Sequence, residues 1–294
     1  MSNNGSSPLV LWYNQLGMND VDRVGGKNAS LGEMITNLSG MGVSVPNGFA
    51  TTADAFNQFL DQSGVNQRIY ALLDETDIDD VSALAKAGAQ IRQWIIDTPF
   101  QSELENAIRD AYDLLSADDA EASFAVRSSA TAEDMPDASF AGQQETFLNV
   151  QGFDAVLVAV KHVFASLFND RAISYRVHQG YDHRGVALSA GVQRMVRSDL
   201  ASSGVMFSID TESGFDQVVF IDLCMGFGRD GGAGRGEPGR ILRPQTDAGR
   251  WPSGDRAPHH GVEKRSVWFT RRPRSTVNRC VSKMCRRRSA IFSR

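Results

Sequence analysis

One arginine stands at the start of a stretch whose residue types suit an anion. Arg127 follows a short apolar run at residues 124–126, which predicts a strand that delivers the arginine at its end. Residues 128–144 are largely small, hydroxylated or glycine, so backbone N–H groups can approach an anion closely. A guanidinium offers five donors in a fixed fork that suits phosphate oxygens. The stretch predicts a polyphosphate site; the alternative is an arginine paired with Glu133 or Asp134 beside an ordinary loop.

A lysine after two glycines forms a second possible phosphate-binding site. Gly25-Gly26-Lys27 precedes a helix that we expect near residues 31–38. The N–H groups of a helix start and a nearby ammonium both attract phosphate. The segment is not a Walker A loop, because the spacing differs and no Lys-Ser/Thr pair follows. Taken alone, it is better interpreted as a glycine turn with a solvated lysine.

The elements around these two stretches predict an α+β protein. Residues 52–115 carry apolar side chains at helical spacing, whereas residues 186–196, 204–208 and 217–221 have the character of strands. The pattern is a helical first half and a strand-rich second half, without a clean βαβ repeat. His178 and His183 have no cysteine or carboxylate at ligand spacing, so we expect no metal site there. His162 is interpreted as a packing residue inside a helix at 153–169.

Composition argues against a membrane-spanning chain, and it divides the chain into an acidic part and a basic part. Of the 294 residues, 41% are hydrophobic and 22% charged, as in soluble proteins. No apolar run reaches the roughly 18–20 residues of a span, and the N-terminus lacks a signal core, so we expect a cytoplasmic chain with no membrane partner. Residues 1–223 hold 13 Lys+Arg and 30 Asp+Glu, whereas residues 224–294 hold 17 and 5. A basic tail of this kind normally suggests a nucleic-acid-binding arm.

Residues 1–221 resemble the N-terminal nucleotide-binding region of bacterial phosphoenolpyruvate synthases (pyruvate, water dikinases). Five motifs in the family's order, over some 180 residues, make the resemblance specific. They are Asp22-Arg23-Val24-Gly25-Gly26-Lys27-Asn28-Ala29-Ser30-Leu31-Gly32, Val126-Arg127-Ser128-Ser129-Ala130, Ser139-Phe140-Ala141-Gly142-Gln143-Gln144-Glu145-Thr146, Gln193-Arg194-Met195-Val196 and Ser203-Gly204-Val205-Met206-Phe207-Ser208.

The resemblance implies an incomplete ATP-grasp-like domain at residues 1–221. Family members convert ATP, pyruvate and water into phosphoenolpyruvate, AMP and phosphate, use Mg²⁺, and are often homodimers. The resemblance places Lys27 and Arg127 on the triphosphate. It assigns the phosphate-covering loop to Ser139, Gly142 and Gln143, and the strand whose backbone reads adenine to Gln193, Met195 and Val196.

The resemblance breaks between Ile221 and Met225. The family continues with Trp-Gly-Leu-Gly-Glu-Met-Val-Val-Gln, whereas this chain has Met225-Gly226-Phe227-Gly228-Arg229-Asp230. Read one base later, the codons for Met225-Gly226 (ATG GGN) begin with TGG, the codon for tryptophan. The same offset reaches each family residue in the run. We therefore interpret residues 222–294 as out-of-frame translation, and expect a disordered tail because its composition does not support a core.

An out-of-frame tail would remove the family's Mg²⁺ carboxylates, its phosphohistidine domain and its pyruvate-binding barrel. We therefore assign no catalytic and no metal-binding residue, and expect the chain not to complete the reaction. Three hypotheses follow: a surviving weak ATP-binding region, an inert and partly unfolded fragment, or accidental polyanion binding by the basic tail without specific nucleic-acid recognition.

Overall fold

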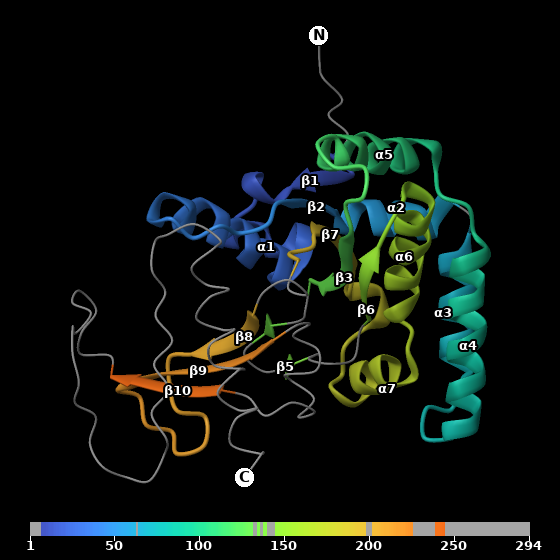
Figure 1. The fold of residues 1–294 in the computed structure, drawn as a ribbon. Helices are drawn as coiled ribbons and strands as arrows, with labels where there is room; N and C mark the ends of the chain where they lie inside the picture. Colours follow the sequence, from blue (N-terminus) through green and yellow to red (C-terminus); the bar gives the residue numbers. More distant parts are fainter. Residues whose placement is uncertain are drawn as a thin grey trace, which may run out of the picture. The chain divides into compact units, whose positions relative to one another are not determined.

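The computed structural model describes residues 7–62, 64–131, 134–135, 138–139, 145–197, 202–225 and 239–244. The chain divides into two compact units, residues 1–196 and residues 197–294. Figure 1 shows the helices gathered in the first unit and strands β8 to β10 in the second. Among the helices of the described ranges, none has the length and apolarity of a membrane span.

The helices of the first unit form where apolar residues recur at helical spacing. In one of them, Leu104, Ile108, Ala111 and Leu115 are all buried, as the predicted stripe requires. Another begins at a cap in which Asp80 accepts hydrogen bonds from the N–H groups of two following residues. The helices are α1 (Val21–Leu38), α2 (Ala53–Gln62), α3 (Val65–Glu75), α4 (Val81–Asp97), α5 (Ser102–Ser116), α6 (Phe153–Ser166) and α7 (Asp170–His178), with short 3-10 turns η1 (Tyr13–Gln15), η2 (Met18–Asp20), η3 (Ser39–Met41) and η4 (His183–Gly185).

A five-stranded antiparallel sheet lies at the centre of the first unit. Its strand order is β1-β2-β7-β3-β6, so strands far apart in the chain lie side by side (Figure 1). The strands are β1 (Val10–Trp12), β2 (Gly48–Thr51), β7 (Leu188–Arg194), β3 (Phe124–Ala130) and β6 (Thr146–Val150), and a separate small pair is β4 (Asp134–Met135) with β5 (Ala138–Ser139). Mixed helix and antiparallel sheet agrees with the predicted α+β composition.

The two faces of this sheet have different chemistry because side chains alternate along each strand. Phe124 and Val126 of β3, with Val192 of β7, lie on the apolar face and join α2 and α6 in the main hydrophobic core. Arg127 lies on the other face, with Gly191 directly opposite it. Helix α1 packs on β3 and β7. The apolar face therefore supports the fold, whereas the polar face presents the residues that could bind an anion.

The second unit contains a three-stranded antiparallel sheet in the order β10-β9-β8. Its strands are β8 (Ser202–Phe207), β9 (Val218–Met225) and β10 (Gly239–Pro244). The predicted boundary after residue 221 falls inside β9, and β10 lies within the predicted tail. The backbone register pairs Ile241 with Ile221 and Leu242 with Phe220. Disorder of the rest of the tail stays a prediction. Much of residues 222–294 lies outside the described residues.

Helix α7 buries an arginine whose partner is a histidine instead of a carboxylate. Arg176 is fully buried; its Nε donates to His183 Nδ1 at 2.9 Å and its Nη1 to the Leu167 carbonyl at 2.7 Å. Its Nη2 has no partner in the part of the chain that the structure describes. Burial and the neighbouring guanidinium lower the pKa of His183 to about 4, because a protonated ring would place two cations together.

Stability should therefore fall as the pH drops from about 6.5 towards 4. In that window the unfolded His183 binds a proton and the folded one does not, so the free energy of unfolding rises with pH. We expect about 1–2 kcal/mol after allowing for the partial exposure of the ring. Urea unfolding across this window checks it: His183→Gln should flatten the pH dependence relative to wild type, and His178→Gln should not. Equal curves for all three proteins would contradict the assignment.

Candidate phosphate site on the polar face of the sheet

Arg127 occupies the middle of the polar face and is half-buried. Its Nη2 donates a hydrogen bond of 3.0 Å to Oε1 of Gln193 on the neighbouring strand. Its Nε is buried and has no hydrogen-bond partner among the described residues. A buried N–H without a partner costs free energy, which an incoming anion oxygen would recover. No ion pair of Arg127 with Glu133 or Asp134 is established, because both side chains lie outside what the structure describes.

The glycine-lysine turn of α1 lies against the same strand. Gly25 has φ +74°, a kink that interrupts the helix, and a second helical segment begins directly after it. The N–H of Asn28 donates to Ser129 Oγ at 3.3 Å. Ser129 lies two residues beyond Arg127, on the same face of β3. Lys27, half-buried in the first turn after the kink, is therefore at the junction with the arginine strand. Sequence reasoning placed the helix start later, near residue 31.

A buried polar network lies between the turn and the sheet. The Tyr13 hydroxyl donates to Asn28 Oδ1 at 3.2 Å, and Asn28 Nδ2 donates to Ser189 Oγ at 2.9 Å and to the Val24 carbonyl at 3.1 Å. Burial raises the pKa of Tyr13 well above its usual range, and the adjacent Arg127 guanidinium partly opposes this. Tyr13 is therefore neutral and can only offer Arg127 an oxygen lone pair or a dipole.

Sequence reasoning missed this network because its residues carry no motif of their own. Tyr13 directly follows strand β1, which ends at Trp12, and has only apolar neighbours before it. In the sequence, Asn28 is one polar residue among others before the predicted helix, and nothing marks it as part of a site. Only the sheet register, which places Ser129 opposite Ser189, brings such residues together across about 100 positions or more of sequence.

The other predicted site residues have different outcomes. Gln193 uses its side chain to hold Arg127 and the Pro46 carbonyl. The backbone N–H of Met195 donates to the Ser123 carbonyl at 2.9 Å, and the Val196 side chain is exposed. Ser139 lies in β5, and its side chain is outside the described residues, as are Gly142 and Gln143. The adenine and loop assignments therefore stay predictions.

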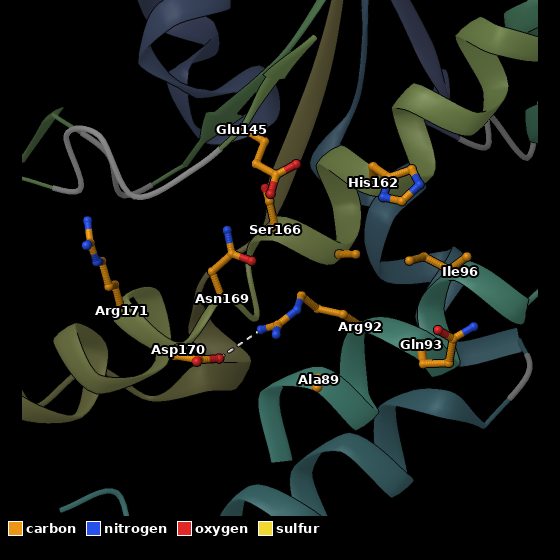
Figure 2. Close-up of a pocket in the computed structure, with 11 residues that line it drawn as sticks. Ala89, Arg92, Gln93, Ile96, Glu145, His162, Ser166, Asn169, Asp170 and Arg171 are labelled. Carbon is orange, nitrogen blue, oxygen red and sulfur yellow. Dashed lines mark hydrogen bonds and ion pairs between the residues drawn. The ribbon is translucent and has the colours of Figure 1, made fainter. Parts of the chain in front are cut away.

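A cavity lies elsewhere, between α4, α6 and α7 (Figure 2). It has a volume of about 630 Å³, and neither Lys27 nor Arg127 lines it. Arg92 and Asp170 form an ion pair of 2.9 Å across it, as Figure 2 shows. His162 is at its rim and also packs on the ring of Phe147, with centroids 5.8 Å apart, which agrees with its predicted packing role. Both signs of charge line this cavity, so it does not match a polyanion as the polar face does.

Metal ligands do not gather anywhere in the described ranges, where no group of three His, Cys, Asp or Glu side chains could hold an ion. The donors of the polar face are N–H groups and hydroxyls, which suit phosphate oxygens and not a bare cation. The donors of this face therefore suit an anion better than a metal ion.

Comparison with known proteins agrees with that chemistry. The pyruvate phosphate dikinase, AMP/ATP-binding domain family matches residues 21–287, which extends beyond the predicted end of the resemblance at residue 221. Phosphoenolpyruvate synthase of Escherichia coli (strain K12) is 93% identical over 228 residues, which are 78% of this chain and 29% of the relative. Phosphoenolpyruvate synthase of Pseudomonas aeruginosa (strain UCBPP-PA14) is 60% identical over 243 residues, 82% and 31% respectively. The chain spans less than a third of the length of these curated relatives.

Proposed function

Because the chain belongs to the pyruvate phosphate dikinase AMP/ATP-binding domain family, we propose that it is the ATP-binding region of a phosphoenolpyruvate synthase and holds the triphosphate on the polar face of its first sheet. The observation that carries this proposal is the Arg127 Nε–H, buried and unpartnered within the described residues, beside the Gly25–Lys27 turn. Because this donor is already withdrawn from water, the arginine N–H itself does not have to be desolvated when an anion oxygen binds it.

We assign separate roles to the two cations. Arg127 donates from a rigid fork and fixes the direction of the phosphate oxygens. Lys27 adds an ammonium charge at a helix start, where backbone N–H groups also attract negative charge. Together they offset the charge of the triphosphate. Mg²⁺ would supply further charge neutralisation, and we place its carboxylate ligands outside the in-frame part of the chain.

We propose that conversion of pyruvate to phosphoenolpyruvate requires segments beyond this chain, because the chain spans less than a third of its curated relatives. The phosphoryl-accepting histidine and the pyruvate site would belong to those segments. We also propose that residues 222–294 are read out of frame. Sequencing the coding DNA across the codons for residues 221–226 tests this: an uninterrupted frame that matches the printed chain and carries no inserted or missing base relative to its relatives would contradict it.

Nucleotide binding to the full 294-residue chain tests the proposed site. Calorimetric titrations with ATP, ADP, AMP and adenosine should show affinity rising with each phosphate, because the polar face binds phosphate and not the base. We expect ATP to bind at least about 10-fold more tightly than AMP, about 1.4 kcal/mol. Equal affinities for ATP and adenosine would contradict a triphosphate site on this face.

A further inference from the structure

Gln193 and Tyr13 are placed to hold Arg127 in one orientation. We propose that they are positioning residues, which occupy the outer part of the guanidinium so that its Nε–H is left for the phosphate. The inference rests on the proposed function, and gives the Gln193 side chain a role beside the adenine contact predicted for the backbone of its strand. Gln193 contacts Arg127 from β7, and Tyr13, in η1, lies close enough to Arg127 for the guanidinium to lower its pKa.

The amide of Gln193 has only one arrangement that satisfies its partners. Its Nε2 donates to the Pro46 carbonyl at 2.9 Å, and a carbonyl oxygen can only accept. Oε1 must therefore face Arg127 Nη2, which donates to it at 3.0 Å. The Pro46 carbonyl thus fixes the direction of the amide, and the amide fixes the guanidinium.

Tyr13 is oriented by a similar chain of directed hydrogen bonds. Asn28 uses Nδ2 as a donor to Val24 and Ser189, so its Oδ1 is the acceptor of the Tyr13 hydroxyl. Ser189 Oγ donates to the Thr51 carbonyl, which leaves it free to accept from Asn28. The Tyr13 proton is therefore committed to Asn28, and its lone pairs are what it presents to Arg127.

Gly191 leaves the space in which this arrangement fits. It is paired with Arg127 across the ladder, and a Cβ built on it would lie 2.5 Å from the Tyr13 hydroxyl and 2.3 Å from Asn28 Oδ1. Any side chain here would displace both. The absence of a side chain at Gly191 therefore leaves the space that the Tyr13 hydroxyl and Asn28 Oδ1 occupy, on the strand paired with that of Arg127.

Guanidinium dynamics test this inference with and without nucleotide. In the full chain labelled with ¹⁵N-arginine, the Nε–Hε signal of Arg127 is assigned by its loss in Arg127→Lys. Held by Gln193, the Arg127 guanidinium should rotate slowly about its Cζ–Nε bond and give separate Nη signals. Gln193→Met, which matches the length of glutamine without its amide, should speed this rotation at least about 10-fold and average the signals. Tyr13→Phe should shift the Nε–Hε signal. Thermal melting would show that both variants fold.

Nucleotide titrations of the same variants separate the two claims. We expect Gln193→Met to weaken ATP binding about 5- to 10-fold and to leave adenosine binding unchanged, whereas a general structural defect would weaken both. The ratio of ATP to GTP affinity should stay unchanged, because Gln193 acts on the phosphate side of the nucleotide. Free rotation of Arg127 in the wild-type chain would overturn the inference, as would a loss that adenosine shares equally. A slowly rotating Arg127 whose signal does not respond to ATP would uphold the positioning of the guanidinium and refute the proposed function instead.

Discussion

Arg127→Ala should lower the affinity of the chain for ATP by about 30- to 100-fold, or about 2–3 kcal/mol. The substitution removes a charge-assisted donor that is already buried and leaves Gln193 Oε1 without its partner. Arg127→Lys should fall between the wild type and alanine, because a lysine keeps the charge and loses the fork. Calorimetric titration of ATP into each protein measures the difference.

Arg109→Ala is the matched control for this loss. Arg109 is an arginine of similar charge on the exposed side of α5, paired with Glu105 one turn away. Its removal changes the net charge equally, so a purely long-range electrostatic effect would appear in both variants. We expect ATP affinity within about twofold of wild type, since salt screens exposed charges that lie more than a Debye length from the ligand. Equal losses in the two variants would contradict a local role for Arg127.

Gly25→Ala should destabilise the first unit by about 3–4 kcal/mol, the largest stability change we expect from a single added methyl group. Two effects combine at this position. The backbone has φ +74°, which L side chains rarely adopt. A Cβ would also lie 2.4 Å from Ser129 Oγ and 2.5 Å from the Ser129 carbonyl oxygen, and the backbone cannot move aside without shifting β3. Urea unfolding measures the loss.

Gly180→Ala separates the two effects. Gly180 has nearly the same backbone conformation, φ +72°, but a Cβ there meets nothing within 4 Å. We expect about 1 kcal/mol, the cost of the conformation alone. The excess loss in Gly25→Ala then measures the close approach of α1 to β3 at Ser129. If both alanines cost the same, α1 does not pack on β3 as described.

Element positions followed well from local pattern. The strand predicted at residues 186–196 contains β7, and the helix predicted from Phe153 is α6, because period-2 and helical spacing are properties of short segments. The start of α1 was placed too late because a glycine pair usually marks a turn, whereas here the kink is confined to Gly25 and the helix continues on both sides. The strand at Gly239–Pro244 was missed because the tail was judged by its overall composition.

The candidate site was predictable only in part. Arg127 and Lys27 stand out in the sequence by charge and glycine context. The partners that orient them come from strands paired over long sequence separations, and no local pattern specifies that Gly191 lies opposite Arg127 or that Pro46 fixes the Gln193 amide. Register in an antiparallel sheet is set by the packing of one whole face. The direction of the Gln193 side chain, towards Arg127, follows from that packing.

A crystal structure of the full chain with a non-hydrolysable ATP analogue would test the triphosphate site most directly. We predict a phosphate oxygen within hydrogen-bond distance of Arg127 Nε and another near Lys27 Nζ, with the Gln193–Arg127 hydrogen bond retained. A triphosphate bound in the cavity beside Arg92 and His162 (Figure 2), with Arg127 Nε still unpartnered, would contradict the account.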